Sequence, residues 1–223
     1  MRERKHMFTL APSVFAADHN SLIDQVYLLK QCGITCLHVD IMDGRFVPLK
    51  AFGPETVLDL KKNTDMKLDV HLMIEEPEKM VSTYAQAGAD AITVHYEACS
   101  EIAGTLDEIH AFGLRAGIAL KPSTDVKDIP KAIWEHLDIL HIMTTQPGRP
   151  GQIFIPEMLE KIAESAALIR SKGRNIQIEV DGDITKERLK PVLKAGAGIV
   201  VVGKAIFQGN IRQNVQDCLQ YCF

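Results

Sequence analysis

Short apolar segments alternate with amphipathic segments along almost the whole chain. The apolar segments are about four to eight residues long, the length typical of buried strands. The amphipathic segments repeat their apolar positions at helical spacing, as at Leu22, Val26 and Leu29. Glycine and proline mark many of the junctions between them. This pattern predicts a regular succession of strand, loop and helix.

The predicted elements form eight consecutive strand–helix units. Strands are expected at residues 8–14, 35–41, 67–72, 91–95, 115–120, 137–143, 176–180 and 199–202. Helices are expected at about residues 21–32, 54–62, 78–87, 101–112, 126–135, 156–171, 186–194 and 211–222. Strands that alternate with helices pair in parallel through right-handed crossovers. Eight such units favour an α/β fold with a single TIM (β/α)8 barrel, which we expect to span residues 1–223 as one catalytic domain.

The composition narrows the classes of protein and of partner. A chain of 223 residues with 46% hydrophobic residues can build one sizeable core. Its net charge is -4, whereas nucleic-acid-binding proteins usually carry an excess of basic residues. We therefore expect no nucleic-acid partner. No segment approaches the roughly 20 apolar residues of a membrane span, and we expect neither a membrane partner nor a signal peptide. Five cysteines without a CxxC pair indicate reduced thiols and a cytoplasmic location.

Polar side chains gather where the predicted strands end, which is where a TIM barrel places its chemistry. His38 and Asp40 share one face of their strand because side chains alternate along it. Burying an unpaired charge is costly, so this pair indicates a metal ion or acid–base chemistry, with a structural His–Asp pair as the alternative. The other polar residues at strand ends are Ser13, Asp69, His71, His95, Glu97, Lys121, His141, Asp181 and Lys204.

Two histidines and two aspartates from three strand ends form a candidate metal site. They are His38, Asp40, His71 and Asp181. A mixed nitrogen and oxygen set suits one divalent transition metal, and it does not choose among Zn, Fe, Mn and Co. Three methionines also lie at strand ends: Met42, Met73 and Met143. They are either gap-filling core residues or an apolar collar that excludes water from a reactive intermediate.

Four stretches resemble the signature motifs of the ribulose-phosphate 3-epimerase family, in the same order and over almost the whole chain. They are residues 38–48 (HVDIMDGRFVP), 68–73 (LDVHLM) with the following Glu76-Pro77, 142–154 (IMTTQPGRPGQIF) and 179–182 (EVDG). Four ordered motifs make a specific resemblance. It implies a phosphate-binding TIM barrel and a homo-oligomer, either a dimer or a hexamer.

The resemblance also implies roles for individual residues. His38, Asp40, His71 and Asp181 would bind the metal, and Asp40 and Asp181 would also be the acid and the base. The substrate site would be lined by Ser13, His71, Met42, Met73 and Met143. The phosphate would be held by loops that contain Gly148, Arg149, Pro150, Gly151, Gly182, Asp183, Gly203 and Lys204.

The chemistry of an epimerase agrees with these roles. Inverting a carbon next to a ketone requires a proton to leave one face and return on the other, which two opposed carboxylates can do. The enediolate formed needs electrostatic stabilisation, which a metal would supply. We therefore expect conversion of D-ribulose 5-phosphate to D-xylulose 5-phosphate. The alternatives are an epimerase of a six-carbon ketose phosphate such as allulose 6-phosphate, a lyase or decarboxylase centred on Lys121, and a non-catalytic sugar-phosphate binder.

The chain departs from the family pattern at the expected phosphate end. Asp183 replaces a usual glycine, Lys204 replaces a usual serine, and Arg149-Pro150 replaces an aromatic residue and a glycine. Asp183 would repel a phosphate, and Lys204 and Arg149 would offset that repulsion. Alternatively, Asp183 caps the helix expected near Thr185 with its carboxylate turned away. The loop at residues 144–154 is long and contains two glycines, so we expect it to be a mobile lid.

Overall fold

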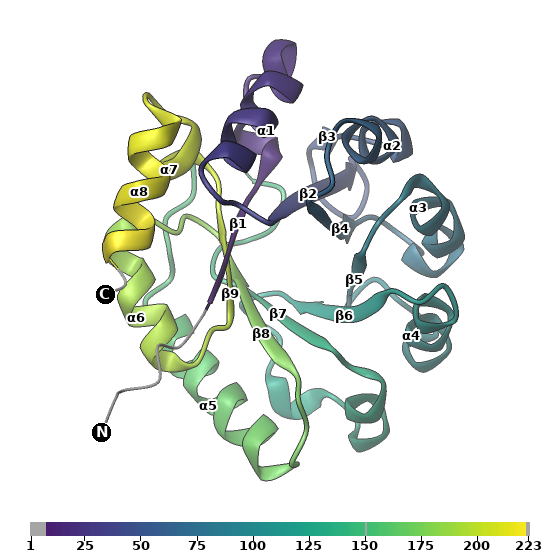
Figure 1. Cartoon of the computed structure of the whole chain (residues 1–223). Coiled ribbons are helices and arrows are strands. Elements are labelled where there is room, and N and C mark those ends of the chain that lie inside the picture. Colours follow the sequence, from purple (N-terminus) through teal and green to yellow (C-terminus); the bar gives the residue numbers. More distant parts are fainter. Residues whose placement is uncertain (1–7, 150, 222–223) are drawn as a thin grey trace.

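The computed structural model describes residues 8–149 and 151–221. Within them, eight parallel strands curl into a barrel that a ring of helices surrounds (Figure 1). These strands are β1 (Thr9–Pro12), β2 (Cys36–Asp43), β4 (Lys67–Met73), β5 (Ala91–His95), β6 (Arg115–Leu120), β7 (Ile139–Met143), β8 (Gln177–Asp181) and β9 (Ile199–Val202). The short β3 (Lys50–Ala51) pairs antiparallel with the end of β2.

The helices follow the strands in turn around the outside of the barrel (Figure 1). The α-helices are α1 (Leu22–Gln31), α2 (Pro54–Asn63), α3 (Val81–Ala87), α4 (Ile102–Ala111), α5 (Met158–Ser171), α6 (Lys186–Ala195), α7 (Lys204–Phe207) and α8 (Ile211–Tyr221). The 3-10 helices are η1 (Val14–Ala16), η2 (His19–Ser21), η3 (Pro77–Lys79), η4 (Val126–Asp128) and η5 (Lys131–His136). In the described part of the chain, no helix is both long enough and apolar enough to cross a bilayer.

The first strand closes the barrel. Along most of its length β1 pairs in parallel with β9, from Thr9 opposite Ile199 to Pro12 opposite Val202. On its other side, Ser13 forms a parallel bridge with His38 of β2. The remaining strands pair with their neighbours in chain order. The expectation of a TIM barrel is therefore confirmed.

The two faces of each strand serve different purposes. In β2, Leu37, Val39 and Ile41 point outward into the main hydrophobic core beneath the helices. The alternate residues, His38 and Asp40, are also buried, so they point into the barrel. Strands β4, β7 and β8 follow the same rule, and the barrel interior is therefore unusually rich in polar groups.

Several elements differ from the expectation, among them β3, η1 and η2, which were not expected. The helix expected at residues 126–135 is instead two 3-10 segments, η4 and η5, because Pro130 lies between them and lacks the N–H that a continuous helix needs. The helix expected after Pro77 is divided at Met80 into η3 and α3. The short helix α7, which follows β9 directly, was not expected.

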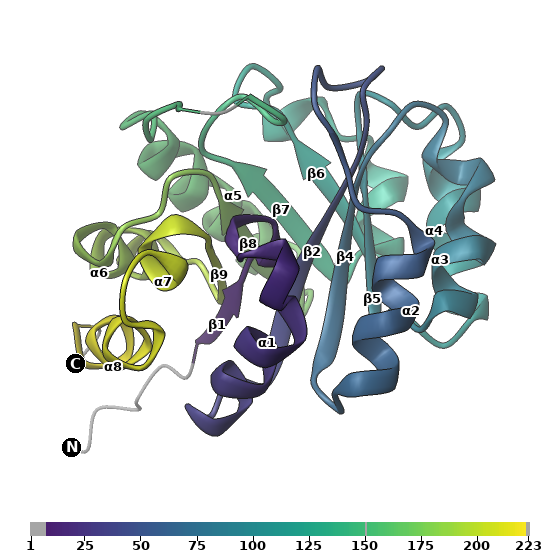
Figure 2. The same cartoon turned by 90° about the horizontal axis from the view of Figure 1, so that it is seen from above.

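The long loops that follow β2 and β7 rise from the same edge of the barrel, the upper edge in Figure 2. This edge is formed by the carboxyl ends of the parallel strands. The loops come into direct contact there, because a Cβ atom added to Gly148 would lie 2.3 Å from Cβ of Val47. With a φ of 61°, Gly148 occupies the left-handed region that favours glycine. The contact therefore requires glycine at position 148, both because a side chain would clash with Val47 and because the backbone is left-handed there.

Candidate active site

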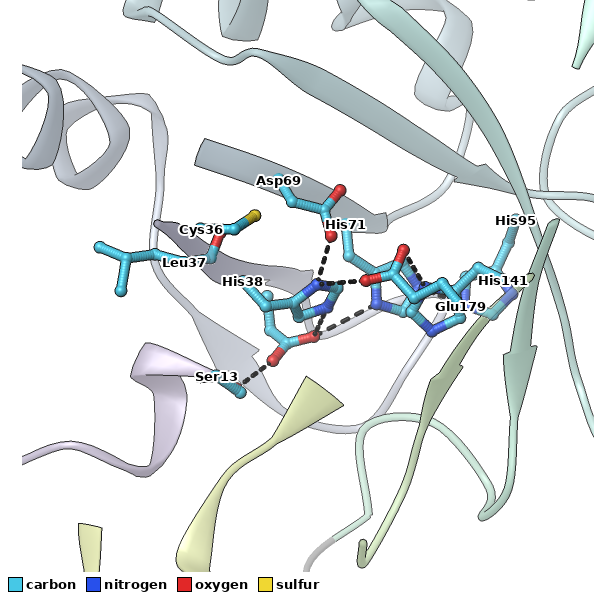
Figure 3. A network of polar contacts seen from close by, with 10 residues as sticks. Ser13, Cys36, Leu37, His38, Asp69, His71, His95, His141 and Glu179 are labelled. Atoms are coloured by element: carbon cyan, nitrogen blue, oxygen red, sulfur yellow. Dashed lines mark hydrogen bonds and ion pairs between the residues drawn. The ribbon is translucent and has the colours of Figure 1, made fainter. Parts of the chain in front are cut away.

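Asp40 lies at the centre of a buried polar network in the barrel. Its Oδ1 atom is 3.3 Å from Nε2 of His38 and 3.2 Å from Nδ1 of His71, while its Oδ2 atom accepts a 2.6 Å hydrogen bond from the Ser13 hydroxyl. The register places Asp40 directly opposite His71. All four residues are at most 6% exposed. Figure 3 shows the network extending from Ser13 at one end to His95 at the other.

The carboxylates of Asp69 and Glu179 orient the His38 ring through its Nδ1 atom. Its Nδ1 atom lies 2.8 Å from Oδ2 of Asp69 and 3.3 Å from Oε1 of Glu179, and Figure 3 shows dashed lines from this atom to both groups. Because a carboxylate accepts, Nδ1 carries the hydrogen and Nε2 faces Asp40. In the described part of the chain, His38 Nε2 is buried without a hydrogen-bond partner. A buried ring nitrogen without a partner, beside a carboxylate, is a position for a cation.

The four residues expected to bind a metal come together. One ligand atom each from His38, Asp40, His71 and Asp181 lies within 4.8 Å of the others. Burial lowers the pKa of His38, but the carboxylates of Asp40 and Asp69 outweigh it and raise the pKa well above its usual value. The pocket therefore attracts positive charge strongly. Its donor set of two imidazole nitrogens and two carboxylates fits one divalent transition metal.

The two candidate acid–base carboxylates differ in their affinity for a proton. Burial raises the pKa of Asp40, but His38 and His71, through charge and hydrogen bonds, hold it well below its usual value. Burial and the charge of Asp40 raise the pKa of Asp181 to about 7. One carboxylate is therefore ionised at neutral pH, while the other binds a proton far more readily than an ordinary aspartate. Pairs whose environments separate their pKa values in this way are typical of acid–base sites.

A deeper layer of polar residues was not assigned to the site from the sequence. Asp69, Glu179 and His141 are fully or almost fully buried and lie next to His38 in the network (Figure 3). Burial and the charge of Glu179 raise the pKa of Asp69 to about 6. Each precedes an expected site residue by two positions in its strand. The sequence had placed Asp69 and His141 at strand ends without giving them a role, and the period of two along a strand was the signal that could have found Glu179.

The structure separates the three methionines into a pair and a single residue. Met42 and Met73 lie opposite each other in the register and pack with Val47 in a small apolar cluster at the mouth of the barrel. Met143 is also buried and lies opposite Asp181 on the neighbouring strand. All three are less than 6% exposed. These side chains place apolar surface beside the carboxylates.

The expected phosphate-binding residues lie in the loops after β7, β8 and β9. Gly182 has a φ of 128°, and an added Cβ would lie 2.6 Å from Oγ1 of Thr145. Thr144, which was not expected, ties the two loops together by donating to the carbonyls of Asp181 at 2.9 Å and Gly182 at 2.6 Å. Gly203 approaches Ala16, at 3.2 Å from an added Cβ. Arg149, Gly151 and Lys204 are exposed, whereas Pro150 lies outside the described residues.

The carboxylate of Asp183 is engaged by residues that the sequence did not suggest. Its Oδ2 atom forms an ion pair with Arg188 and accepts a 3.2 Å hydrogen bond from the backbone N–H of Phe154. The Arg188 guanidinium also lies over the Phe154 ring, 5.1 Å from its centre. The alternative that Asp183 caps the helix is wrong, because Thr185 occupies the cap position of α6. Arg188 provides the charge compensation that we had expected from Lys204.

Comparisons with known proteins agree with this geometry. The family described as the ribulose-phosphate 3 epimerase family matches residues 9–207. The ribulose-phosphate 3-epimerase of Bacillus subtilis is 41% identical over 90% of this chain and 93% of its own length. That of Synechocystis is 42% identical over 89% and 86% of the two chains.

Solved structures support the same architecture. The 3-keto-L-gulonate-6-phosphate decarboxylase of Vibrio cholerae superposes with a TM-score of 0.72 over 96% of both chains, at 14% identity. This likeness concerns the fold alone, because the sequence identity is low. The match to the family, in contrast, extends through every strand of the barrel. The chain belongs to the ribulose-phosphate 3-epimerase family and is an isomerase of the epimerase class.

Proposed function

We propose that the protein inverts C3 of a ketose phosphate and that its substrate pair is D-ribulose 5-phosphate and D-xylulose 5-phosphate. The observation that carries this proposal is the pair of carboxylates, the buried Asp40 and the partly buried Asp181, with their opposite pKa shifts. The names of the two relatives described above, both ribulose-phosphate 3-epimerases, support a five-carbon substrate.

The proton balance of the reaction matches these two carboxylates. Epimerisation begins with one carboxylate ionised and the other protonated, and it ends with these states exchanged. The ionised group removes the proton on C3 from one face, and the protonated group delivers its own proton to the other face. The low pKa of Asp40 and the pKa of Asp181 near 7 provide one proton for the pair at neutral pH. Neither group needs an external proton donor within one turnover.

We propose that His38, Asp40, His71 and Asp181 hold a divalent cation, and the convergence of their ligand atoms within 4.8 Å supports this. When bound, such a cation supplies positive charge to the substrate oxygens on which negative charge develops. The Ser13 hydroxyl orients Asp40 through its 2.6 Å hydrogen bond. The buried Met42 and Met73 exclude water from the carboxylates, which strengthens their electrostatic interactions.

The phosphate is assigned to the loops after β7, β8 and β9, which contain Gly148, Gly182 and Gly203. In many TIM barrels the loops after the last two strands, together with a short additional helix, bind phosphate. Here those loops follow β8 and β9, and the additional helix is α7. Lys204, exposed at the start of α7, supplies positive charge beside them.

Incubation of the purified protein with D-ribulose 5-phosphate in D2O tests the proposal. We expect D-xylulose 5-phosphate that carries deuterium at C3, loss of activity after chelation, and its return when one divalent ion is added. Allulose 6-phosphate is the comparison substrate, and a higher kcat/KM for it would replace the pentose by the hexose. A decarboxylase centred on Lys121 would leave this substrate unchanged, because D-ribulose 5-phosphate has no carboxylate to release as CO2. In the structure, the Lys121 ammonium lies over the Phe46 ring, 3.9 Å from its centre.

A further inference from the structure

His71 is connected to the exterior of the barrel by a chain of polar contacts that the proposed reaction does not use. Its Nε2 atom lies 3.0 Å from Nε2 of His95, and Nδ1 of His95 lies 3.1 Å from Oε2 of Glu97. Both histidines are completely buried, and their rings lie side by side in Figure 3. The chain therefore runs from the Asp40 carboxylate through two imidazole rings to a third residue at the end of β5.

Hydrogen-bond polarity allows only one arrangement of protons along this chain. Glu97 is ionised, because hydrogen bonds from His95, Thr124 and the backbone of Lys121 outweigh burial and lower its pKa to about 2. A carboxylate only accepts, so Nδ1 of His95 carries the hydrogen. A neutral imidazole that carries its hydrogen on Nδ1 has a lone pair on Nε2, so this atom of His95 is an acceptor. The hydrogen between the two rings consequently belongs to Nε2 of His71.

This polarity determines what His71 presents to Asp40. With its hydrogen on Nε2, a neutral His71 has a lone pair on Nδ1, which faces Oδ1 of Asp40 at 3.2 Å. Two acceptors at this distance repel each other unless a positive charge lies between them. The opposite neutral tautomer, with Nδ1 donating to Asp40, would satisfy the pair without any cation. That tautomer would leave two acceptor nitrogens facing each other between His71 and His95.

We propose that His95 and Glu97 are positioning residues that hold His71 in the tautomer able to bind a metal through Nδ1. This inference rests on the metal site of the proposed function, and it adds two residues that touch neither the cation nor the substrate. Asp69 likewise holds His38 in one tautomer, because it accepts a hydrogen bond from Nδ1 of that ring. The two ligand histidines are thus oriented from opposite sides, one by a carboxylate directly and the other through a second imidazole.

Glu97, the residue of this contact series farthest from Asp40, is held in place by hydrogen bonds. Glu97 Oε1 accepts a 2.8 Å hydrogen bond from the backbone N–H of Lys121 and another from the Thr124 hydroxyl. The Phe46 ring, from the loop after β2, lies against the His95 ring with 4.8 Å between their centres. These contacts hold the acceptor oxygen and the His95 ring in place, so that the tautomer of His71 is set before a cation arrives.

Three variants and one control test the proposal. His95→Met removes the acceptor at similar size, His95→Gln restores a side-chain carbonyl oxygen near the Nε2 position, and Glu97→Ala removes the anchor. The control, His110→Met, makes the same substitution in an exposed pair whose Nε2 atom lies 2.9 Å from Asp138. Affinity for Zn²⁺ is measured by competition with a chelator, and the tautomer of His71 by the nitrogen chemical shifts of its ring.

We expect His95→Met and Glu97→Ala to weaken Zn²⁺ binding by about 10- to 100-fold, the range typical of groups that orient metal ligands. His95→Gln and His110→Met should remain within about threefold of the wild type. Before metal is added, the ring of His71 in His95→Met should carry hydrogen on Nδ1, which it does not in the neutral wild-type ring. Circular dichroism verifies folding, and Glu97→Ala keeps the test valid if His95→Met does not fold.

Each outcome separates this inference from the proposed function. A wild-type protein that binds no divalent ion overturns the metal site itself. Tight binding by the wild type with equal affinity in both His95→Met and Glu97→Ala overturns only the positioning role. A loss in His95→Gln as large as that in His95→Met also overturns it, because packing rather than the acceptor nitrogen would then be responsible.

Discussion

Replacing either acid–base carboxylate by its amide should stop epimerisation and leave exchange on one face of the substrate. Asp40→Asn and Asp181→Asn keep the size of the side chain but cannot accept and return a proton. The remaining carboxylate can still remove the proton on its own side and put it back. In D2O, each variant should therefore introduce deuterium at C3 of one epimer without forming the other, and the two variants should label opposite epimers.

The magnitude follows from the roles of the two groups. General acid–base catalysis contributes roughly 10²- to 10⁴-fold, which corresponds to about 3 to 5 kcal/mol in activation free energy. Asp40 and Asp181 also belong to the set whose ligand atoms lie within 4.8 Å, so each variant is expected to bind metal more weakly. The assay therefore contains saturating metal, and the metal content is measured separately. This separates the lost proton transfer from the lost cation.

Proton NMR of the C3 position follows exchange and epimerisation in the same sample. Asp65→Asn is a matched control, because Asp65 forms a surface ion pair with Lys30 at 2.7 Å and its side chain is 77% exposed. It should retain full activity. Turnover within tenfold of the wild type in either site variant would refute the two-base reasoning, as would labelling of the same epimer by both variants.

Metal affinity should fall as the pH drops from 8 to 6, because a cation must displace the proton that His38 holds with its raised pKa, whereas a flat profile in chelator competition over this range would contradict this. Gly148→Ala should expose the loop after β7 to protease and raise KM, because the new Cβ would clash with Cβ of Val47 and the left-handed backbone costs about 1 kcal/mol; the double variant with Val47→Gly, which removes that Cβ, should recover part of the loss. Asp183→Gly should leave KM for the sugar phosphate unchanged or lower it, and a marked increase would contradict the present assignment of its charge to Arg188. Lys204→Ala should raise KM roughly tenfold at constant kcat, as expected for one lost charge-assisted contact, and an unchanged KM would remove Lys204 from the phosphate site.

Much of the barrel could be predicted from local pattern. The strands Ala91–His95, Arg115–Leu120 and Ile199–Val202 begin and end where the apolar runs do, because each run is bounded by glycine or polar residues. The hydrophobic pattern predicted helices less well where backbone chemistry or a very short length determines the structure. Pro130 prevents a helix that the spacing of apolar residues favoured, and the short α7 is too small to leave a periodic signal.

The position of the candidate site could also be predicted from the sequence, because the carboxyl ends of parallel strands meet at one edge of a barrel. His38, Asp40, His71 and Asp181 were identified from their places at strand ends, and the structure brings their ligand atoms together. The alternation of side chains along each strand was sufficient for this, since a period of two assigns every second residue to the interior.

Contacts between those residues were decided only by the tertiary structure. The stagger of neighbouring strands places Asp40 beside His71, and His141 beside Glu179, and no single strand records that register. The closure of the barrel likewise brings Ser13 to β2. Asp183 shows the same dependence, because its left-handed backbone, with a φ of 49°, directs the carboxylate to Arg188. Local sequence thus determined which chemical groups enter the barrel, whereas strand register and backbone geometry determined which of them form pairs.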